Sequence, residues 1–222
     1  MTIIKTSILS LLMISLFCTA SEETLYKGNP KIPFTSPTPW LNTREDLLRH
    51  LPQNAVVAEI GVWEGAFSTA ILNLAKPNKL FLIDAWEEQP VSVYEEQPTQ
   101  QLYDYLLAQV TKKFANDPRV TILKQYSNKA ASQFPDNYFD WIYIDGNHAY
   151  EAVKDDLAVW LPKIKTGGFI TGHDYFAYTP DKPSISQTFG VVQAVNEFIY
   201  EHKFELVYLT NESIPSYAIA IK

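Results

Sequence analysis

Residues 56–68 read Val-Val-Ala-Glu-Ile-Gly-Val-Trp-Glu-Gly-Ala-Phe-Ser, and this stretch decides the fold. Its first five residues are apolar except for Glu59, which is typical of a buried strand, and its last residues begin a helix-like pattern. Two glycines interrupt the turn between them. Gly61 can adopt backbone angles that a side chain forbids, and Gly65 lets the helix approach closely. The stretch therefore predicts a strand, a glycine-interrupted turn and a helix.

A second acidic strand end follows this unit. Residues 79–84 read Lys-Leu-Phe-Leu-Ile-Asp, so Asp84 closes the next apolar run. In strand–turn–helix units of this kind the amides of the turn face a nucleotide-like ligand, and the acid of the second strand accepts hydrogen bonds from ribose hydroxyls. The two halves together predict a cofactor site in which Asp84 binds the ribose.

The rest of the chain alternates apolar runs with amphipathic segments. The 222 residues are 46% hydrophobic, which suffices for one core, and no linker divides them. The alternation predicts an α/β fold with a mostly parallel sheet, helices on both faces and a C-terminal antiparallel hairpin. Strands are expected near 56–60, 79–84, 119–123, 139–145 and 167–172, helices near 42–51, 65–75, 99–115, 127–133, 149–161 and 190–201, and hairpin strands near 204–210 and 216–221.

Polar side chains recur at the carboxyl ends of the predicted parallel strands. In an open sheet of this class, ligands bind beyond these ends. A single acid at a strand end is usually a helix cap, but several at one edge indicate a site. Two aromatic segments, residues 86–94 and 175–178, flank this edge and are candidate lids. The strand-end residues are Glu59, Asp84, Ser127, Asp145 and Asp174.

Two further blocks carry a resemblance to a known family. Residues 139–151 read FDWIYIDGNHAYE, and residues 161–175 read LPKIKTGGFITGHDY. Together with the glycine turn and its strand-ending acid, they resemble the class I S-adenosylmethionine-dependent methyltransferases, which have a Rossmann-like sheet. Within these the chain is similar to the small O-methyltransferase-like group related to macrocin O-methyltransferase. The similarity runs from residue 43 to residue 222, and Trp63 departs from it by replacing the middle glycine of the usual turn.

The resemblance implies that the cofactor is S-adenosylmethionine, and it assigns residues to it. Glu59, Gly61 and Gly65 would face the methionine end, Asp84 the ribose and Ser127 the adenine rim. From the residues alone, Glu59 has an equal alternative, which is to bind the amides of its own turn.

The resemblance also implies a catalytic centre. Asp145 and Asp174 would hold a divalent cation, and carboxylate oxygens with water suit Mg²⁺ or a similar hard ion. His148 matches the position of a proposed general base, since an imidazole titrates near neutral pH and a metal lowers the pKa of a hydroxyl. His173 stands where relatives often have a second carboxylate, and its simpler role is to bind neighbouring loops. The implied reaction is methyl transfer to oxygen, on a sugar or another small hydroxylated metabolite.

Two other functions stay open at this point. A nicotinamide dinucleotide also needs an acid for its ribose, but residues 62–64, Val-Trp-Glu, put a bulky ring and a negative charge where its pyrophosphate would lie. The other alternative is an exported binding or accessory protein of the same fold that does not turn over a substrate.

The N-terminus and the charge balance bear on location and partners. Residues 1–20 combine Lys5, an apolar run and small residues, as a secretory signal peptide does, and residues 21–42 form a proline-rich, extended leader before the domain at 43–222. Export is therefore expected, without stable membrane insertion after cleavage; a cytoplasmic or membrane-anchored protein is the alternative. The net charge of −7 opposes phosphate backbones and disfavours nucleic acid, so a small-molecule acceptor is expected. The amino-acid sequence does not indicate an oligomeric state.

Overall fold

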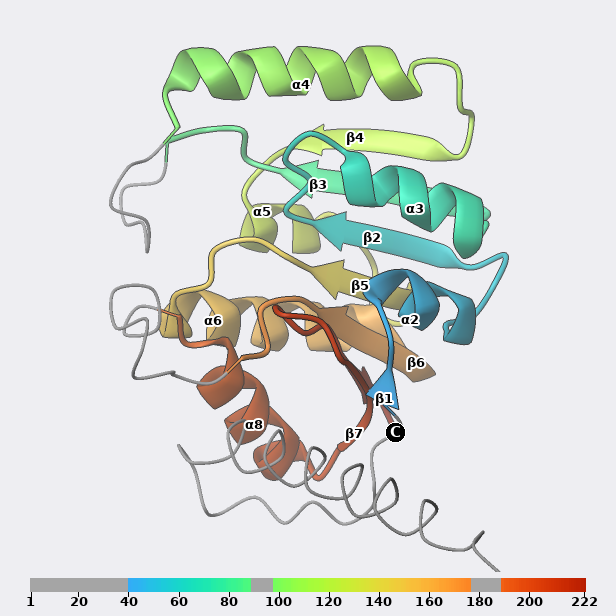
Figure 1. Ribbon diagram of the computed structural model, residues 1–222, viewed down its shortest axis with the longest axis vertical. Helices are drawn as coiled ribbons and strands as arrows, with labels where there is room; N and C mark the ends of the chain where they lie inside the picture. The colour runs from blue at the N-terminus through green and yellow to red at the C-terminus, as the bar shows by residue number, and fades with distance from the viewer. Residues whose placement is uncertain (1–39, 89–97, 177–188) are drawn as a thin grey trace, which may run out of the picture.

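The computed structural model describes residues 40–88, 98–176 and 189–222, which form an eight-stranded sheet flanked by helices (Figure 1). The strand order is β1-β7-β8-β6-β5-β2-β3-β4. The strands are β1 (Trp40–Leu41), β2 (Val56–Ile60), β3 (Lys79–Asp84), β4 (Val120–Lys124), β5 (Phe139–Ile144), β6 (Ile164–Gly172), β7 (Glu205–Thr210) and β8 (Tyr217–Ala220). The helices are α2 (Arg44–His50), α3 (Ala66–Leu74), α4 (Gln100–Phe114), α5 (Ser127–Ala131), α6 (Tyr150–Trp160) and α8 (Val191–His202), with a 3₁₀ turn, η1, at Leu161–Lys163.

The sheet is mostly parallel, as the alternating pattern predicts. Strands β2 to β6 pair in parallel, and β8 pairs antiparallel with both β6 and β7, which gives the expected C-terminal hairpin. The Rossmann-like fold class is therefore confirmed. Because the parallel strands all end at the same edge, their carboxyl ends bring distant residues together.

Helices cover both faces, and each face has its own hydrophobic cluster. Side chains of α2, α3 and α4 pack on one face together with Val57, Leu80 and Trp141. Side chains of α5, α6 and α8 pack on the other face with Ala58, Ile142 and Ile170. Successive residues of β2 and β5 thus point to opposite faces, since side chains alternate along a strand. The central strands are therefore buried on both sides, and this packing fixes the position of their carboxyl ends.

One strand lies outside the predicted set. Trp40 and Leu41 fall in the stretch expected to be an extended leader, and they form β1, which pairs in parallel with β7 at the edge of the sheet. The following helix starts where the sequence indicates, because the Thr43 hydroxyl accepts a hydrogen bond from the amide of Asp46 at 3.2 Å. The expected signal peptide lies outside the described residues and stays a prediction. Within the described ranges, no helix has the length and apolar character needed to cross a bilayer.

Candidate functional site

The turn after β2 lies directly against the end of β5. Gly61 has a φ of +87° and its amide donates to the carbonyl of Ile83 at 2.9 Å. A Cβ added to Gly61 would lie 2.0 Å from the carbonyl oxygen of Asp145, and no side chain can approach a backbone atom so closely. The position therefore needs glycine for two reasons, the left-handed backbone and the passing chain. This contact joins the expected cofactor turn to the expected catalytic strand end.

Asp84 holds the turn in place. Its Oδ2 accepts hydrogen bonds from the amides of Val62 and Trp63 at 2.8 and 3.0 Å, and its Oδ1 accepts one from the amide of Trp86 at 2.8 Å. The turn amides are therefore bound by Asp84, whereas Glu59 has a different partner. Since a carboxylate oxygen can accept two hydrogen bonds, Oδ1 retains capacity for a ribose hydroxyl.

Two tryptophans complete this turn. Trp86 is fully buried, and its indole N–H donates to the carbonyl of Trp63 at 3.0 Å. The expectation that Trp86 belongs to a lid is therefore wrong, because its indole is buried and its N–H is hydrogen-bonded to the turn. Tyr175, at the start of the other candidate lid, is likewise buried, with its hydroxyl bonded to Asn196. Residues 89–94 and 177–178 of the two candidate lids lie outside the described residues, and their role stays a prediction. Trp63 is 43% exposed, has a φ of +54° and meets Tyr103 edge to face.

Glu59 lies beneath the turn and is almost completely buried. Its carboxyl group accepts a hydrogen bond from the hydroxyl of Ser68 in α3. Burial raises the pKa of Glu59 to about 8, and the nearby charges of Asp145 and Asp84 add to the effect, while Ser68 and Arg44 oppose it. Glu59 is thus protonated at neutral pH, and it supports the first turns of α3 from below.

A pH-dependent stability follows from Glu59. Because its pKa is raised above the ordinary value of 4.5, the contribution is complete below that value and is lost as the pH rises through about 8. Glu59→Gln removes this loss. We expect its unfolding free energy, relative to the parent, to rise by about 3 kcal/mol from about pH 5 to pH 8, at roughly 1.4 kcal/mol per pKa unit. Urea denaturation at several pH values measures this; Glu201→Gln, on the exposed face of α8, is the control, and parallel curves for Glu59→Gln and the parent would contradict it.

The ends of β5 and β6 form a carboxylate–histidine cluster. Asp145 follows β5, Asp174 follows β6, and His148 precedes α6; one ligand atom from each lies within 4.8 Å of the others. The Nε2 of His148 is 3.0 Å from Asp174 Oδ2 and 3.4 Å from Asp145 Oδ1. The structure therefore brings together the residues expected to bind a cation and to act as base.

The electrostatics of this cluster are dominated by mutual pairing. Burial alone would lower the pKa of His148, but its hydrogen bonds with Asp145 and Asp174 outweigh burial and raise the pKa to about 9. Burial would raise the pKa of Asp174, yet His148 and His173 hold it well below its usual range. The Nδ1 of His173 lies 2.9 Å from Asp174 and 3.8 Å from Asp145. In this arrangement the carboxylate of Asp174 is charged and the imidazole of His148 carries a proton.

Ser127 is bound on the far face of the sheet from the glycine turn. It begins α5, and its hydroxyl accepts a hydrogen bond from the indole of Trp160 at 2.8 Å. The same hydroxyl is bonded to Asp156, whose pKa is raised to about 6 because burial outweighs that bond. The adenine role of Ser127 stays a prediction, and these contacts show that the side chain also ties α5 to α6.

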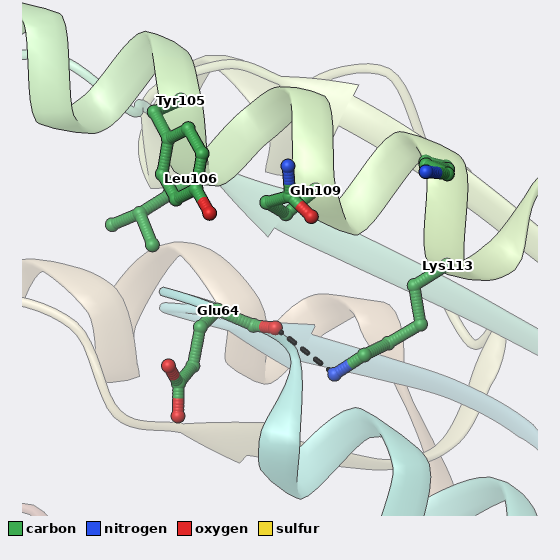
Figure 2. Close-up of a pocket in the computed structure, with 6 residues that line it drawn as sticks. Glu64, Tyr105, Leu106, Gln109 and Lys113 are labelled. Carbon is green, nitrogen blue, oxygen red and sulfur yellow. Dashed lines mark hydrogen bonds between the residues drawn. The ribbon is translucent and has the colours of Figure 1, made fainter.

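An open hollow of about 540 Å³ lies between α4 and the glycine turn (Figure 2). Lys113 extends from α4, and its ammonium donates to the backbone carbonyls of Glu64 and Gly65 at 3.2 Å. Figure 2 shows Tyr105, Leu106 and Gln109 on the same side of α4. The residues that line the hollow include none of the carboxylate–histidine cluster. Of its two lysines, Lys112 and Lys113, the second holds the end of the turn in place.

Comparison with known proteins identifies this arrangement. A family model described as "Methyltransferase domain" matches residues 58–175, which is more than half of the chain and runs from the glycine turn to the second carboxylate loop. The chain belongs to this methyltransferase family. Its class I fold, expected from the resemblance of the sequence, is confirmed.

Curated relatives of this methyltransferase-family chain carry no assigned activity. The uncharacterized protein R132 of Acanthamoeba polyphaga mimivirus is 27% identical over 158 residues, covering 67% of this chain and 65% of its own length. The uncharacterized protein y4gI of Sinorhizobium fredii is 24% identical over 123 residues, which is 53% of this chain and 13% of that protein. The chain thus spans less than two thirds of either relative.

Solved structures of methyltransferases share the fold. A SAM-dependent methyltransferase from Aquifex aeolicus superposes with a TM-score of 0.59 at 16% identity, covering 82% of this chain and 91% of that one. A protein from Staphylococcus aureus, provisionally named caffeoyl-CoA O-methyltransferase, superposes with a TM-score of 0.55 at 14% identity, covering 95% and 92%. At these identities the likeness concerns the fold.

Arg44 is a residue of the site that no sequence pattern indicates. Arg44 begins α2, and its Nη1 lies 3.9 Å from Asp145 Oδ2 while its guanidinium covers the ring of Phe67 at 4.6 Å. Arg44 precedes the glycine-turn motif at residues 56–68. It lies in a run of charged residues that is typical of any surface helix. No local signal in the sequence relates it to a strand end a hundred residues away.

Proposed function

We propose that this protein is an S-adenosylmethionine-dependent O-methyltransferase acting on a small hydroxylated molecule with the help of a divalent cation. One observation carries the proposal: the glycine turn expected to hold the cofactor abuts the backbone of Asp145, the first residue of the carboxylate–histidine cluster. A methyl donor on the turn and an acceptor oxygen at the cluster would be neighbours, as in-line transfer requires.

The cofactor assignment is supported by family and geometry. The similar Aquifex aeolicus protein is named SAM-dependent, and the Asp84 oxygen that keeps acceptor capacity lies beside the turn. A nicotinamide dinucleotide is the weaker candidate, because Trp63 and Glu64 occupy the part of the turn that a pyrophosphate would need.

The cluster fits a hard divalent cation. Two carboxylates and an imidazole offer ligand atoms within 4.8 Å of one another, and oxygen ligands suit Mg²⁺. When bound, such an ion would polarise an acceptor hydroxyl and lower its pKa. Asp145 and Asp174 would hold the ion, and its positive charge would offset the two carboxylates that keep a proton on His148. The neutral imidazole of His148 would then accept the hydroxyl proton. The Staphylococcus aureus neighbour, named for O-methyl transfer, is consistent with this chemistry.

Partners and location follow the same proposal. The chain is acidic, with a formal net charge of −7, so a nucleic acid is a poor acceptor and a sugar or phenol is favoured. Export by the N-terminal segment is retained as part of the proposal, and the alternative of an exported accessory protein would show cofactor binding without turnover.

Calorimetric titration with S-adenosylhomocysteine tests the cofactor. The parent should bind it, and Asp84→Asn should bind about 10- to 100-fold more weakly, because a charged hydrogen bond to the ribose is weakened. Asp136→Asn, which alters an exposed carboxylate paired with Lys163, should bind like the parent. Binding of NADH in place of S-adenosylhomocysteine would favour the nicotinamide alternative, and equal affinity of Asp84→Asn and the parent would remove Asp84 from the site.

A further inference from the structure

Arg44 carries a permanent positive charge at the site edge. Its backbone is fixed, since its amide donates to Glu212 Oε2 at 2.7 Å in the loop between β7 and β8. Its guanidinium lies over Phe67, in the first turn of α3, at 4.6 Å from the ring centroid. Stacking on an aromatic ring suits the planar guanidinium and leaves the N–H groups at its rim available. The side chain is thus held at the site by two contacts, the ring stacking and the backbone hydrogen bond, that use none of the guanidinium N–H groups.

The acidic neighbours of Arg44 are loosely paired with it. The shortest nitrogen–oxygen distances are 3.9 Å, to Asp145 Oδ2 and to Glu45 Oε1, and both exceed hydrogen-bond length. The Tyr143 hydroxyl lies within hydrogen-bonding reach and also contacts Ser216 at 2.8 Å. A guanidinium has five N–H donors, and among the described residues no carboxylate accepts from it at hydrogen-bond distance. Its fork can therefore bind an incoming anion.

The strand order fixes what lies next to Arg44. In the sequence β5-β2-β3, Asp84 ends β3, Gly61 follows β2 and Asp145 follows β5. A cofactor whose ribose is bound by Asp84 and whose chain crosses the Gly61 turn reaches the end of β5. Neighbouring strands are about 4.8 Å apart, so this span is on the order of 10 Å, comparable to the reach from ribose to carboxylate in an extended methionyl chain.

An anionic end group at that place requires a cation. Asp145 and Asp84 add negative charge around the turn, and a carboxylate brought there without a partner would be repelled. We propose that Arg44 binds the α-carboxylate of the methionine part of S-adenosylmethionine, through paired charge-assisted hydrogen bonds. This inference rests on the proposed function and adds to it the residue that recognises the amino-acid end of the cofactor.

Two ligands that differ only in the carboxylate test this role. S-adenosylmethionine and decarboxylated S-adenosylmethionine share adenosine, sulfonium and amine. Calorimetric titration of the parent, Arg44→Gln and Arg44→Lys with each ligand separates the carboxylate contact from the rest. Arg44→Gln should weaken binding of S-adenosylmethionine about 10- to 100-fold and binding of the decarboxylated ligand less than about twofold. Arg44→Lys, which keeps the charge and loses the fork, should fall between.

Arg49→Gln is the matched control. Arg49 lies on the same helix and pairs with Asp46 at 2.7 Å on its exposed side, so both ligands should bind this variant as they bind the parent. Unchanged binding of S-adenosylmethionine by Arg44→Gln would overturn the proposal and leave an anionic acceptor as the candidate ligand of Arg44. Equal weakening of both ligands in Arg44→Gln and Arg44→Lys would also overturn it, and would assign Arg44 to supporting α3. If the parent binds neither ligand, the proposed function itself fails.

Discussion

Gly61→Ala should destabilise the protein by at least about 4 kcal/mol, which is a large part of the total stability of a typical domain. The new methyl group would meet the carbonyl oxygen and carbon of Asp145 at 2.0 and 2.4 Å, and both are backbone atoms. The amide of the same residue donates to the carbonyl of Ile60 at 2.7 Å, so the backbone that must shift is the one that joins β5 to the end of β2. Urea denaturation measures the change.

Gly167→Ala is the control that isolates the backbone angle. Gly167 has a φ of +81°, close to that of Gly61, but a Cβ there would have no neighbour within 4 Å. Gly167→Ala should lower the free energy of unfolding by only about 1 kcal/mol, because alanine is strained in a left-handed backbone. Equal losses for the two variants would show that strain, rather than contact between the turn and β5, makes Gly61 necessary.

His148→Ala should lower turnover by about 10²- to 10⁴-fold with little change in cofactor affinity, since a positioned base acts on the acceptor and not on the donor. Turnover is followed as formation of S-adenosylhomocysteine with an acceptor found among sugars and phenols. The residue is buried, stacks on Phe189 at 4.8 Å between centroids and reaches both carboxylates. His50→Ala, which changes an exposed histidine of α2, should leave turnover unchanged.

Removal of divalent cations extends the same experiment. EDTA should abolish the turnover of the parent, and Mg²⁺ should restore it, because Asp145 and Asp174 would then have their ion again. Full activity in EDTA would remove the metal from the proposal. Parental turnover of His148→Ala would remove the base, and the two outcomes are independent.

Much of this architecture could be predicted because it depends on local patterns. The run at 56–60 and the acid at 84 define their strands through apolar residues and their ends, and the observed β2 and β3 have these bounds. The strand ends meet at one edge because parallel strands leave no other arrangement. The same rule predicts that Asp145 and Asp174, which follow two parallel strands, lie close together.

Other features depend on contacts that no local pattern contains. Asp84 accepts hydrogen bonds from turn amides more than 20 residues earlier, and Trp86 donates to the carbonyl of Trp63 across a similar separation. A bulky aromatic at position 86 equally suits an exposed loop. Arg44 reaches Asp145 across the sequence, through the packing of α2 on Phe67. The two-residue strand β1 is too short to carry a periodic signal and exists through its pairing with β7.

The three amide hydrogen bonds to Asp84 bear on the thermodynamics of ligand capture. As the polypeptide folds, these hydrogen bonds fix the conformation of two turns, the one at residues 61–65 and the one that follows β3. The loss of conformational entropy that a loose glycine loop would suffer on meeting a ligand has therefore already occurred. Such preorganisation favours rapid, rigid-body association of a small molecule at the sheet edge, with most of the binding free energy left to distinguish one ligand from another.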